Sequence, residues 1–427
     1  MSVGRSVIVA GLVMGLGMIT AACQEAETPK TGTTTTNAEN PKQLKLGSLL
    51  PSTGDLGSLG GPMMASVPLL VDTVNQCGGV NGQPVTLVAS DDQTDATAGT
   101  EAVTRLVNVE KVAGVVGSFA SGVSMAGAAV TSRNKVMMIS PGSTSPELTK
   151  KSKEFNGYWA RTAPSDAYQA PAMAKLAYDK GYRKIATIVI NNDYGIGFEK
   201  EFIKAFKALG GTIVNEAKPT RYDPKATTLK TEAAEVFSSK PDAVAAIMYL
   251  ESGSLLLKSA YEQGLSQNIP VLLPDGMYSD DLAKKVGQTK DGKYIAAGVL
   301  GTIPGADGTA LASFTKIWEA KLKRPVGAYA AHSWDAAALL VLAAQASGKN
   351  TGEGIQSKIS AVANGPGEAV TDVCEGLKLL TAGKPINYQG ASGNVDLDAN
   401  GDVIGSYDIW TVKDDGTIGK LGNVKSK

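Results

Sequence analysis

Two loops rich in serine, threonine and glycine contain the residues whose types could bind a ligand. They follow the short apolar runs 112–116 and 136–139, and each loop opens a helical stretch. Such runs are typical of buried parallel strands. Hydroxyl and backbone N–H groups at two helix starts form a small anion site beyond the carboxyl ends of the strands. Because the loops are small and poor in basic residues, this site suits one carboxylate and not a nucleotide.

The same loops also have a purely structural interpretation. Serine and threonine after a strand are usual helix N-caps. Two neighbouring loops with the same character favour a ligand site, but the spacing of the residues leaves both interpretations open.

Few residues are available for catalysis or for binding a metal. The chain has three cysteines and one histidine, without Cys-x-x-Cys or His-x-x-x-His spacing, which argues against a zinc or haem site. His332 lies in an alanine-rich helical stretch, where its neighbours would satisfy it. No Gly-x-Ser-x-Gly elbow, Walker loop or kinase signature occurs. We therefore predict that the chain is not an enzyme and has no catalytic residues, metal or cofactor.

The composition narrows the class of partner. The chain has 427 residues, and its 41 Lys and Arg balance 41 Asp and Glu, so its formal net charge is zero. There is no basic stripe of the kind that binds nucleic acid. The length fits one or two ordinary domains.

The N-terminus resembles an export signal of bacterial lipoproteins. Residues 1–22 contain Arg5 and then an apolar run that is too short to span a bilayer. The segment Ile19-Thr-Ala-Ala-Cys23 is similar to a lipobox, which implies that Cys23 is lipidated, although Thr20 stands where leucine is usual. Ordinary signal-peptide cleavage is the alternative. Residues 23–43 are polar and predict a flexible tether.

From residue 44 onward, short apolar runs alternate with helical patterns, which predicts a doubly wound parallel sheet of the α/β class. After residue 163 the alternation begins again, so a second unit of similar size follows the first. Two similar lobes usually bind a ligand in the cleft between them. The expected strands are 44–50, 85–89, 112–116, 136–139, 184–190, 243–249, 270–273, 295–300 and 406–412.

Five motifs in register resemble a known family. They are Leu46-Gly-Ser-Leu-Leu-Pro-Ser-Thr-Gly54, Gly78-Gly-Val-Asn-Gly82, Asp91-Asp92, Ser140-Pro-Gly-Ser-Thr-Ser-Pro-Glu-Leu148 and Asn192-Asp-Tyr-Gly-Ile-Gly197. Together they are similar to the type I periplasmic substrate-binding proteins of ABC transporters, in the branch that binds leucine, isoleucine, valine and other neutral amino acids. The resemblance covers residues 44–412.

The resemblance implies two Rossmann-like lobes joined by three hinge crossings. Lobe one would comprise residues 44–161 and 302–395, and lobe two would comprise residues 162–301 and 396–427. Lobe one would bind the ligand through Ser121 and a carboxylate-binding pair, Ser143 and Thr144.

Lobe two would contribute Tyr194 and Tyr249, together with Asp275, which would hold the ligand ammonium where glutamate is common. Such a site suits a zwitterion, because hydroxyl and N–H groups face one end and a carboxylate faces the other. Taken alone, the tyrosines could be packing residues and Asp275 could belong to an Asp-Gly turn. Relatives that bind branched-chain amino acids have a tyrosine where this chain has Leu59, which would widen the pocket.

Export and the family pattern together predict a disulfide between Cys77 and Cys374, since both would lie in lobe one in an oxidising space. Two buried free thiols are the alternative.

We expect a lipid-anchored protein, periplasmic or on the outer face of the cytoplasmic membrane, that passes an amino acid to the permease subunits of an ABC transporter. An amide, urea or small carboxylate is the alternative ligand on the same fold. A lipid-anchored hydrolase and a receptor sensing domain are alternatives of other classes.

Overall fold

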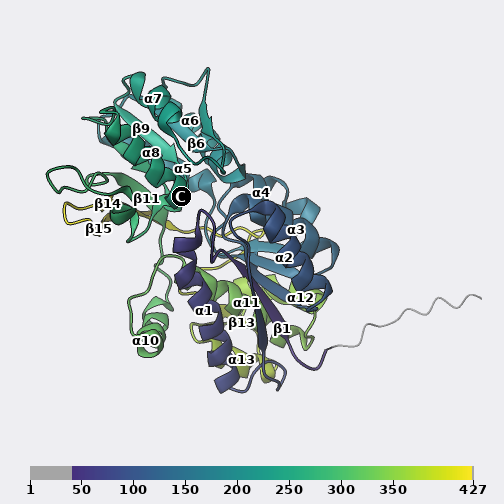
Figure 1. The fold of residues 1–427 in the computed structure, drawn as a ribbon. Helices are drawn as coiled ribbons and strands as arrows, with labels where there is room; N and C mark the ends of the chain where they lie inside the picture. The colour runs from purple at the N-terminus through teal and green to yellow at the C-terminus, as the bar shows by residue number, and fades with distance from the viewer. Residues whose placement is uncertain (1–40, 426–427) are drawn as a thin grey trace, which may run out of the picture. The chain divides into compact units, whose positions relative to one another are not determined.

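The computed structural model describes residues 41–425, which form one compact unit. The expected signal peptide at residues 1–22, the lipidation site at Cys23 and most of the expected tether lie outside the described residues. Within the described range the chain forms two α/β lobes, each with its own sheet and helices, as the alternating pattern predicts (Figure 1).

The first sheet is entirely parallel and has the strand order β2-β1-β3-β4-β5. Its order reverses between β1 and β3, where ligands bind in doubly wound sheets. The register places Leu46 of β1 opposite Gly114 of β3. The strands are β1 (Lys45–Leu50), β2 (Thr86–Asp91), β3 (Gly114–Gly117), β4 (Met137–Ser140) and β5 (Trp159–Arg161).

Helices lie on both faces of the first sheet, and we call this assembly lobe one. Helix α2 packs on α3, whereas α11 packs on α1, α12 and α13. Residues 330–344 of α11 are buried all round the helix, as its run of Ala, Leu and Val requires. The helices are α1 (Gly57–Gln76), α2 (Ala96–Asn108), α3 (Ser121–Arg133), α4 (Pro146–Lys150), α10 (Leu311–Leu322), α11 (Ala330–Ser347), α12 (Gly352–Asn364) and α13 (Val373–Thr381).

The second sheet has the order β15-β14-β11-β10-β9-β6-β7, and β8 also pairs with β6. Its strands are parallel except at one edge, where β14 and β15 run antiparallel. The strands are β6 (Lys184–Ile190), β7 (Thr212–Ile213), β8 (Thr220–Tyr222), β9 (Ala243–Ile247), β10 (Val271–Leu273), β11 (Leu300–Pro304), β14 (Ser406–Val412) and β15 (Ile418–Lys425).

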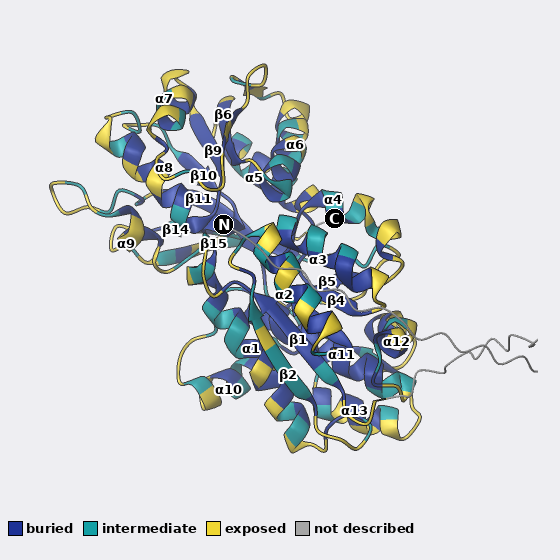
Figure 2. Cartoon of the chain, turned by 45° about the vertical axis from the view of Figure 1, so that its right-hand side comes forward, coloured by how far each residue is buried: buried dark blue, intermediate teal, exposed yellow. Residues whose placement is uncertain are grey.

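This sheet and its helices form lobe two. Helix α5 packs on α6, and α8 packs on α7 and α9. In both lobes the central strands are buried and the outer faces of the helices are exposed (Figure 2). The helices are α5 (Asp166–Asp179), α6 (Asp193–Ala208), α7 (Lys230–Ser238), α8 (Leu250–Glu262) and α9 (Leu282–Val286).

Short elements complete the fold. They are the 3₁₀ turns η1 (Ser152–Phe155) and η2 (Asp275–Met277) and the parallel pair β12 (Glu368–Val370) and β13 (Ile386–Tyr388).

One expected strand is displaced. The sequence predicts a strand over residues 295–300, but β11 only begins at Leu300. Gly298 has φ of +84°, and the Ile295 N–H donates to the Gly287 carbonyl, so this stretch is turned rather than extended. The prediction of a strand over residues 295–300 is therefore wrong, because an apolar run this short cannot distinguish a buried strand from a buried loop.

The chain crosses between the lobes three times. The first crossing follows β5, the second follows β11, and the third precedes β14. Because β11 continues to Pro304, the expected boundary at residue 302 falls inside a strand of lobe two. Gly401 accepts a hydrogen bond from the Arg161 N–H, so the segment before β14 stays with lobe one beyond the expected boundary at residue 396.

The structure bonds Cys77 to Cys374. Cys77 directly follows α1, and Cys374 lies in α13, with 5.9 Å between their Cα atoms. That separation lies in the ordinary range for disulfides. The bond links the end of the first helix of lobe one to its last helix.

Candidate functional site

The candidate site lies where the carboxyl ends of the two sheets face each other. Residues from both lobes line a small cavity of about 10 Å³. A cavity of roughly this volume holds no more than a single water, so this cavity would have to widen before it could hold an amino acid. The lining residues are Leu56, Phe119, Ser121, Gly142, Tyr194, Tyr249, Asp275 and Gly276.

Four of the residues expected in the site therefore line this cavity: Ser121, Tyr194, Tyr249 and Asp275. Ser121 is the first residue of α3, directly beyond the loop that follows β3. Its Oγ accepts a hydrogen bond from the Ser145 N–H at 3.2 Å, which ties the two hydroxyl-rich loops together. Each of these side chains lies beyond the carboxyl end of a strand, where the parallel topology brings them together.

The aromatic wall comes from lobe two. Tyr194 lies in the first turn of α6 and Tyr249 precedes α8, and their rings stack with centroids 5.4 Å apart. The stacked rings offer a flat apolar surface, while each hydroxyl remains a polar tip.

Asp275 is the acid of the site, and only 3% of it is exposed. Its Oδ1 accepts hydrogen bonds from the Tyr194 hydroxyl at 3.0 Å and from Gln169 Nε2 at 3.1 Å. Its Oδ2 accepts a hydrogen bond from the Tyr329 hydroxyl at 2.8 Å, which reaches across from lobe one. Burial raises the pKa of Asp275, because it removes the charged form from water, and the hydrogen bonds from the three neutral donors offset this only in part.

The adjacent glycine allows this approach. A Cβ on Gly276 would lie 2.5 Å from the Met248 carbonyl oxygen, so only glycine fits against the chain that leads into Tyr249. Close packing therefore explains the Asp-Gly pair better than an isolated surface turn does.

A second buried acid lies beside the first. Asp166 Oδ2 accepts a hydrogen bond from Thr144 Oγ1 at 2.8 Å, while its Oδ1 is buried without a hydrogen-bond partner. Burial, and then the charge of Asp275, raises the pKa of Asp166 well above its ordinary value. The Oε1 of Gln169, on the same face of α5, is also buried without a hydrogen-bond partner.

The structure places the expected carboxylate-binding pair differently. Neither Ser143 nor Thr144 lines the cavity. Ser143 Oγ lies 3.0 Å from the Phe119 carbonyl oxygen and 2.8 Å from Ser124 Oγ, so its hydroxyl is used within the fold. The reason is that two loops packed side by side must satisfy their own buried polar groups first.

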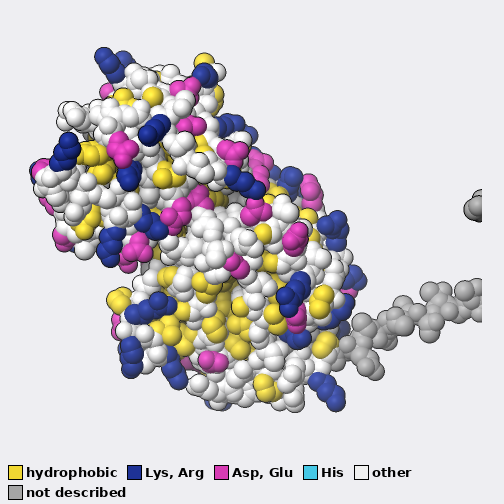
Figure 3. Space-filling view, in the orientation of Figure 1, with side chains coloured by type: hydrophobic (Ala, Val, Ile, Leu, Met, Phe, Trp, Pro, Cys, Tyr) yellow, Lys and Arg dark blue, Asp and Glu magenta, His cyan; other side chains and the backbone are white. Residues whose placement is uncertain are grey.

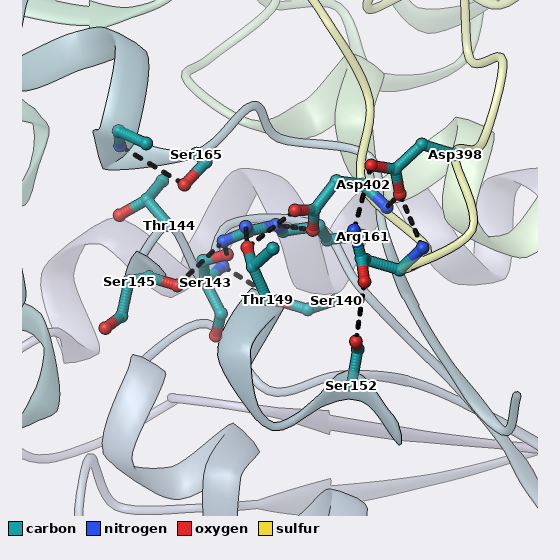
Figure 4. A network of polar contacts seen from close by, with 12 residues as sticks. Ser140, Ser143, Thr144, Ser145, Thr149, Ser152, Arg161, Ser165, Asp398 and Asp402 are labelled. Carbon is teal, nitrogen blue, oxygen red and sulfur yellow. Dashed lines mark hydrogen bonds and ion pairs between the residues drawn. The ribbon is translucent and has the colours of Figure 1, made fainter. Parts of the chain in front are cut away.

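A buried arginine holds these loops in place (Figure 4). The Nε of Arg161 pairs with Asp402 Oδ1 at 2.7 Å, and its Nη1 donates to the Ser143 and Ser145 carbonyls, each at 3.1 Å. Its Nη2 donates to Thr149 Oγ1 at 2.7 Å. The guanidinium is therefore committed to the scaffold and does not offer its charge to a ligand.

Sequence reasoning missed three residues, namely Asp166, Gln169 and Tyr329. For Asp166 and Gln169 the available signal was their i, i+3 spacing in the first turn of α5, after the Ser165 cap. Tyr329 gave no comparable signal, although it adopts a left-handed conformation with φ of +59° at the start of α11.

Leu59, which the resemblance implies would widen the pocket, also lies outside the cavity lining. Leu59 is buried in α1 and is not among the lining residues, whereas Leu56 is. The loop after β1 therefore contacts the site three residues earlier than the resemblance implied.

Further observations limit the chemistry of the described residues. No group of three or more His, Cys, Asp and Glu side chains within residues 41–425 is placed to hold a metal ion. No helix in that range has the length and apolar character needed to cross a membrane. Positive and negative side chains are interspersed over the face shown in Figure 3.

Comparisons with known proteins agree with this architecture. Residues 62–415 match the family described as the receptor family ligand binding region. The chemotactic signal transduction system substrate-binding protein BasB of Halobacterium salinarum is 27% identical over 391 residues, which cover 87% of each chain.

Two solved structures share the fold. A leucine-binding protein from Thermotoga maritima superposes with a TM-score of 0.74 at 24% identity, covering 90% of this chain and 99% of that one. An ABC-transporter solute-binding protein from R. palustris in complex with benzoate has a TM-score of 0.71 at 21% identity, covering 90% and 97%.

The family match spans most of the chain, and the two solved structures share its fold. The chain therefore belongs to the receptor family ligand binding region family, as a type I periplasmic binding protein that binds a solute and is not an enzyme.

Proposed function

We propose that this protein captures a neutral or branched-chain amino acid between its lobes and delivers it to an ABC permease. The observation that carries the proposal is Asp275, a buried carboxylate in the cavity that contacts only neutral donors. An ammonium group placed against it would provide the missing charge-assisted hydrogen bond. At the opposite wall, the Ser121 hydroxyl would bind the ligand carboxylate.

The charge of the site favours an amino acid over a simple anion. The cavity lining contains no Lys, Arg or His, and Asp166 adds a second acid behind Asp275. A benzoate-like ligand, such as the one bound by the R. palustris structure, would bring a negative charge toward these two acids without a cation to offset it. An uncharged amide or urea would not need Asp275 to be ionised. The shared fold of the leucine-binding protein from Thermotoga maritima supports the proposal of an amino-acid ligand.

The apolar part of the cavity suits an aliphatic side chain. Leu56 and Phe119 lie on the lobe-one side, opposite the rings of Tyr194 and Tyr249. Because the cavity has a volume of only about 10 Å³, binding requires the lobes to separate by a hinge motion at the three crossings and to close again.

Export and anchoring complete the proposal. The lipobox-like segment ending at Cys23 would place the protein at the outer face of the membrane, within reach of the permease subunits. Intact-mass measurement of the native protein should show a lipid-modified Cys23 as the N-terminal residue. An unmodified mature chain would contradict the anchor but not the ligand site.

A thermal-shift screen against the amino acids, acetamide, urea and benzoate tests the ligand class, since a ligand at 100 times its Kd stabilises the folded state by about 2.7 kcal/mol. Calorimetric titration then compares the wild type with Asp275→Ala. Loss of one partner of a buried charge pair typically costs about 2–5 kcal/mol, so we expect affinity to fall by roughly 30-fold or more.

Asp281→Asn is the matched control, because its side chain is 55% exposed and lies in the same lobe. It should bind as the wild type does. If Asp275→Ala binds the best amino acid with unchanged affinity, Asp275 does not hold the ammonium, and the amide reading takes its place.

A further inference from the structure

Helix α8 in lobe two starts without a cap from its own lobe. Its N-cap residue is Tyr249, whose side chain makes no capping hydrogen bond. The first N–H groups of any helix need acceptors from elsewhere. Here the acceptor comes from the opposite lobe: Asp55, in the loop after β1, accepts from the Ser252 N–H at 2.9 Å through Oδ1.

The contact is bidentate and specific. Asp55 Oδ2 also accepts a hydrogen bond from Ser252 Oγ at 2.7 Å. Ser252 Oγ in turn lies 2.7 Å from the buried Tyr222 hydroxyl, so the capping geometry is held by a side chain within lobe two. A carboxylate at this position also has a favourable interaction with the positive end of the helix dipole.

Other polar contacts between the lobes near α8 are weaker. Ser58 Oγ donates to Glu251 Oε1 at 2.9 Å, but this contact is exposed to solvent. Lys225 lies 3.4 Å from Asp95, and the lysine side chain is 84% exposed. Contacts of this kind contribute little in water. Asp55 is therefore the charged group that meets α8 with the least competition from solvent.

We infer that Asp55 is a positioning residue that holds the ligand-closed form together by capping α8 from across the cleft. Opening the lobes would leave the Ser252 N–H and the Asp55 carboxylate to water, and closing would pair them again. Because α8 begins immediately after Tyr249, the same contact sets where this ring stands against the ligand. Asp55 acts through the helix and does not itself line the inner cavity.

The inference rests on the two-lobed ligand site of the proposed function. The contact between Asp55 and Ser252 should affect the rate at which the ligand leaves, because this cap forms only after the ligand has entered the open cleft. Ligand entry should be nearly unaffected. A residue that merely stabilises lobe one would instead leave the off-rate unchanged.

The test uses the full chain with Asp55→Ala, Asp55→Asn and Ser58→Ala, and L-leucine as the probe. Stopped-flow fluorescence should show leucine leaving Asp55→Ala about tenfold faster than wild type, the effect expected from losing one helix cap. The on-rate should change by less than about twofold. Asp55→Asn should lie between the two, since its amide oxygen can still accept from the Ser252 N–H. Ser58→Ala, in the first turn of α1 and also facing lobe two, should match the wild type.

Hydrogen–deuterium exchange of residues 250–253, with and without leucine, reads the contact directly. Exchange there should be faster in Asp55→Ala than in wild type or Ser58→Ala. Equal exchange in all proteins under both conditions, or an off-rate that Asp55→Ala leaves unchanged, overturns the inference. A wild type that fails to bind leucine contradicts the proposed leucine-like ligand instead, and the exchange measurement then still decides on the cap.

Discussion

The two sides of the cleft differ in how their buried charged groups are paired. On lobe one, the loops beside Ser121 are fixed by a buried guanidinium, Arg161, that is already paired with Asp402. On lobe two, Asp275 is buried and held only by neutral donors. The lobe-one side is thus electrostatically satisfied before a ligand arrives, whereas the lobe-two side is not. The buried charge of lobe one is therefore already paired within the fold, whereas the buried carboxyl of lobe two has no cationic partner.

Removing Arg161 should have the largest effect on this contrast. Arg161→Met leaves Asp402 unpaired and removes the donors to the Ser143 and Ser145 carbonyls. Breaking a buried ion pair in this way typically lowers the free energy of unfolding by about 3–5 kcal/mol. Urea denaturation measures it, with the exposed Arg133→Met as a control expected to stay within about 0.5 kcal/mol. A loss below about 1 kcal/mol would show that the lobe-one scaffold does not depend on this arginine.

The unmet charge of lobe two should appear as a dependence on pH. The pKa values of Asp275 and Asp166 are raised above the ordinary 3.8, so the folded, ligand-free protein retains protons that the unfolded chain has lost. Their contribution to stability therefore falls as pH rises from about the ordinary value through the raised pKa.

A ligand ammonium favours the ionised carboxyls, so amino-acid binding should release protons and should weaken as pH falls through the raised pKa. Titration calorimetry in two buffers with different ionisation enthalpies measures the release. Asp166→Asn should release fewer protons than wild type. Equal release by the two proteins would mean that Asp166 does not titrate with the site. Asp92, whose burial raises its pKa to about 6, lies in lobe one. It is present in both proteins, so any protons that it releases cancel in the comparison.

Thr144→Ala should have a moderate effect, because Thr144 connects the two sides. Its hydroxyl donates to Asp166 at 2.8 Å, and its loss leaves that buried acid without this partner. We expect ligand affinity to fall by roughly five- to tenfold, less than for Asp275→Ala, because Thr144 does not line the cavity and acts only through Asp166. Calorimetric titration of the two variants side by side decides; a Thr144→Ala loss as large as that of Asp275→Ala would reverse the assignment of the charged side.

Ser143→Ala should have the smallest effect on binding. Its hydroxyl contacts the Phe119 carbonyl and Ser124 rather than the cavity. The free energy of unfolding should fall by about 1–2 kcal/mol through the loss of a buried hydrogen bond, while ligand affinity should change by less than about threefold. A large loss of affinity without a loss of stability would instead support the direct ligand contact expected from the resemblance.

The sequence by itself determined the alternating α/β pattern and the two lobes. The central strands of lobe one are short buried runs whose burial follows from local composition, as in Gly114–Gly117 and Met137–Ser140. The residues beyond such strands could be anticipated because parallel strands place their carboxyl ends at one edge. Tyr194 and Tyr249 were expected only from the family resemblance, as were the ligand roles of Ser121 and Asp275, and all four residues line the cavity.

Only the tertiary structure decided which of these groups remain available to a ligand. Ser143 and Thr144 are adjacent in the sequence and chemically alike, yet one hydroxyl satisfies a neighbouring loop and the other a buried acid. Tyr329 and Asp55 reach across the cleft from segments 54 and 197 residues away from their partners Asp275 and Ser252. Local patterns encode burial and turn preference, but the partner of a buried polar group depends on packing between distant segments, which no local pattern contains.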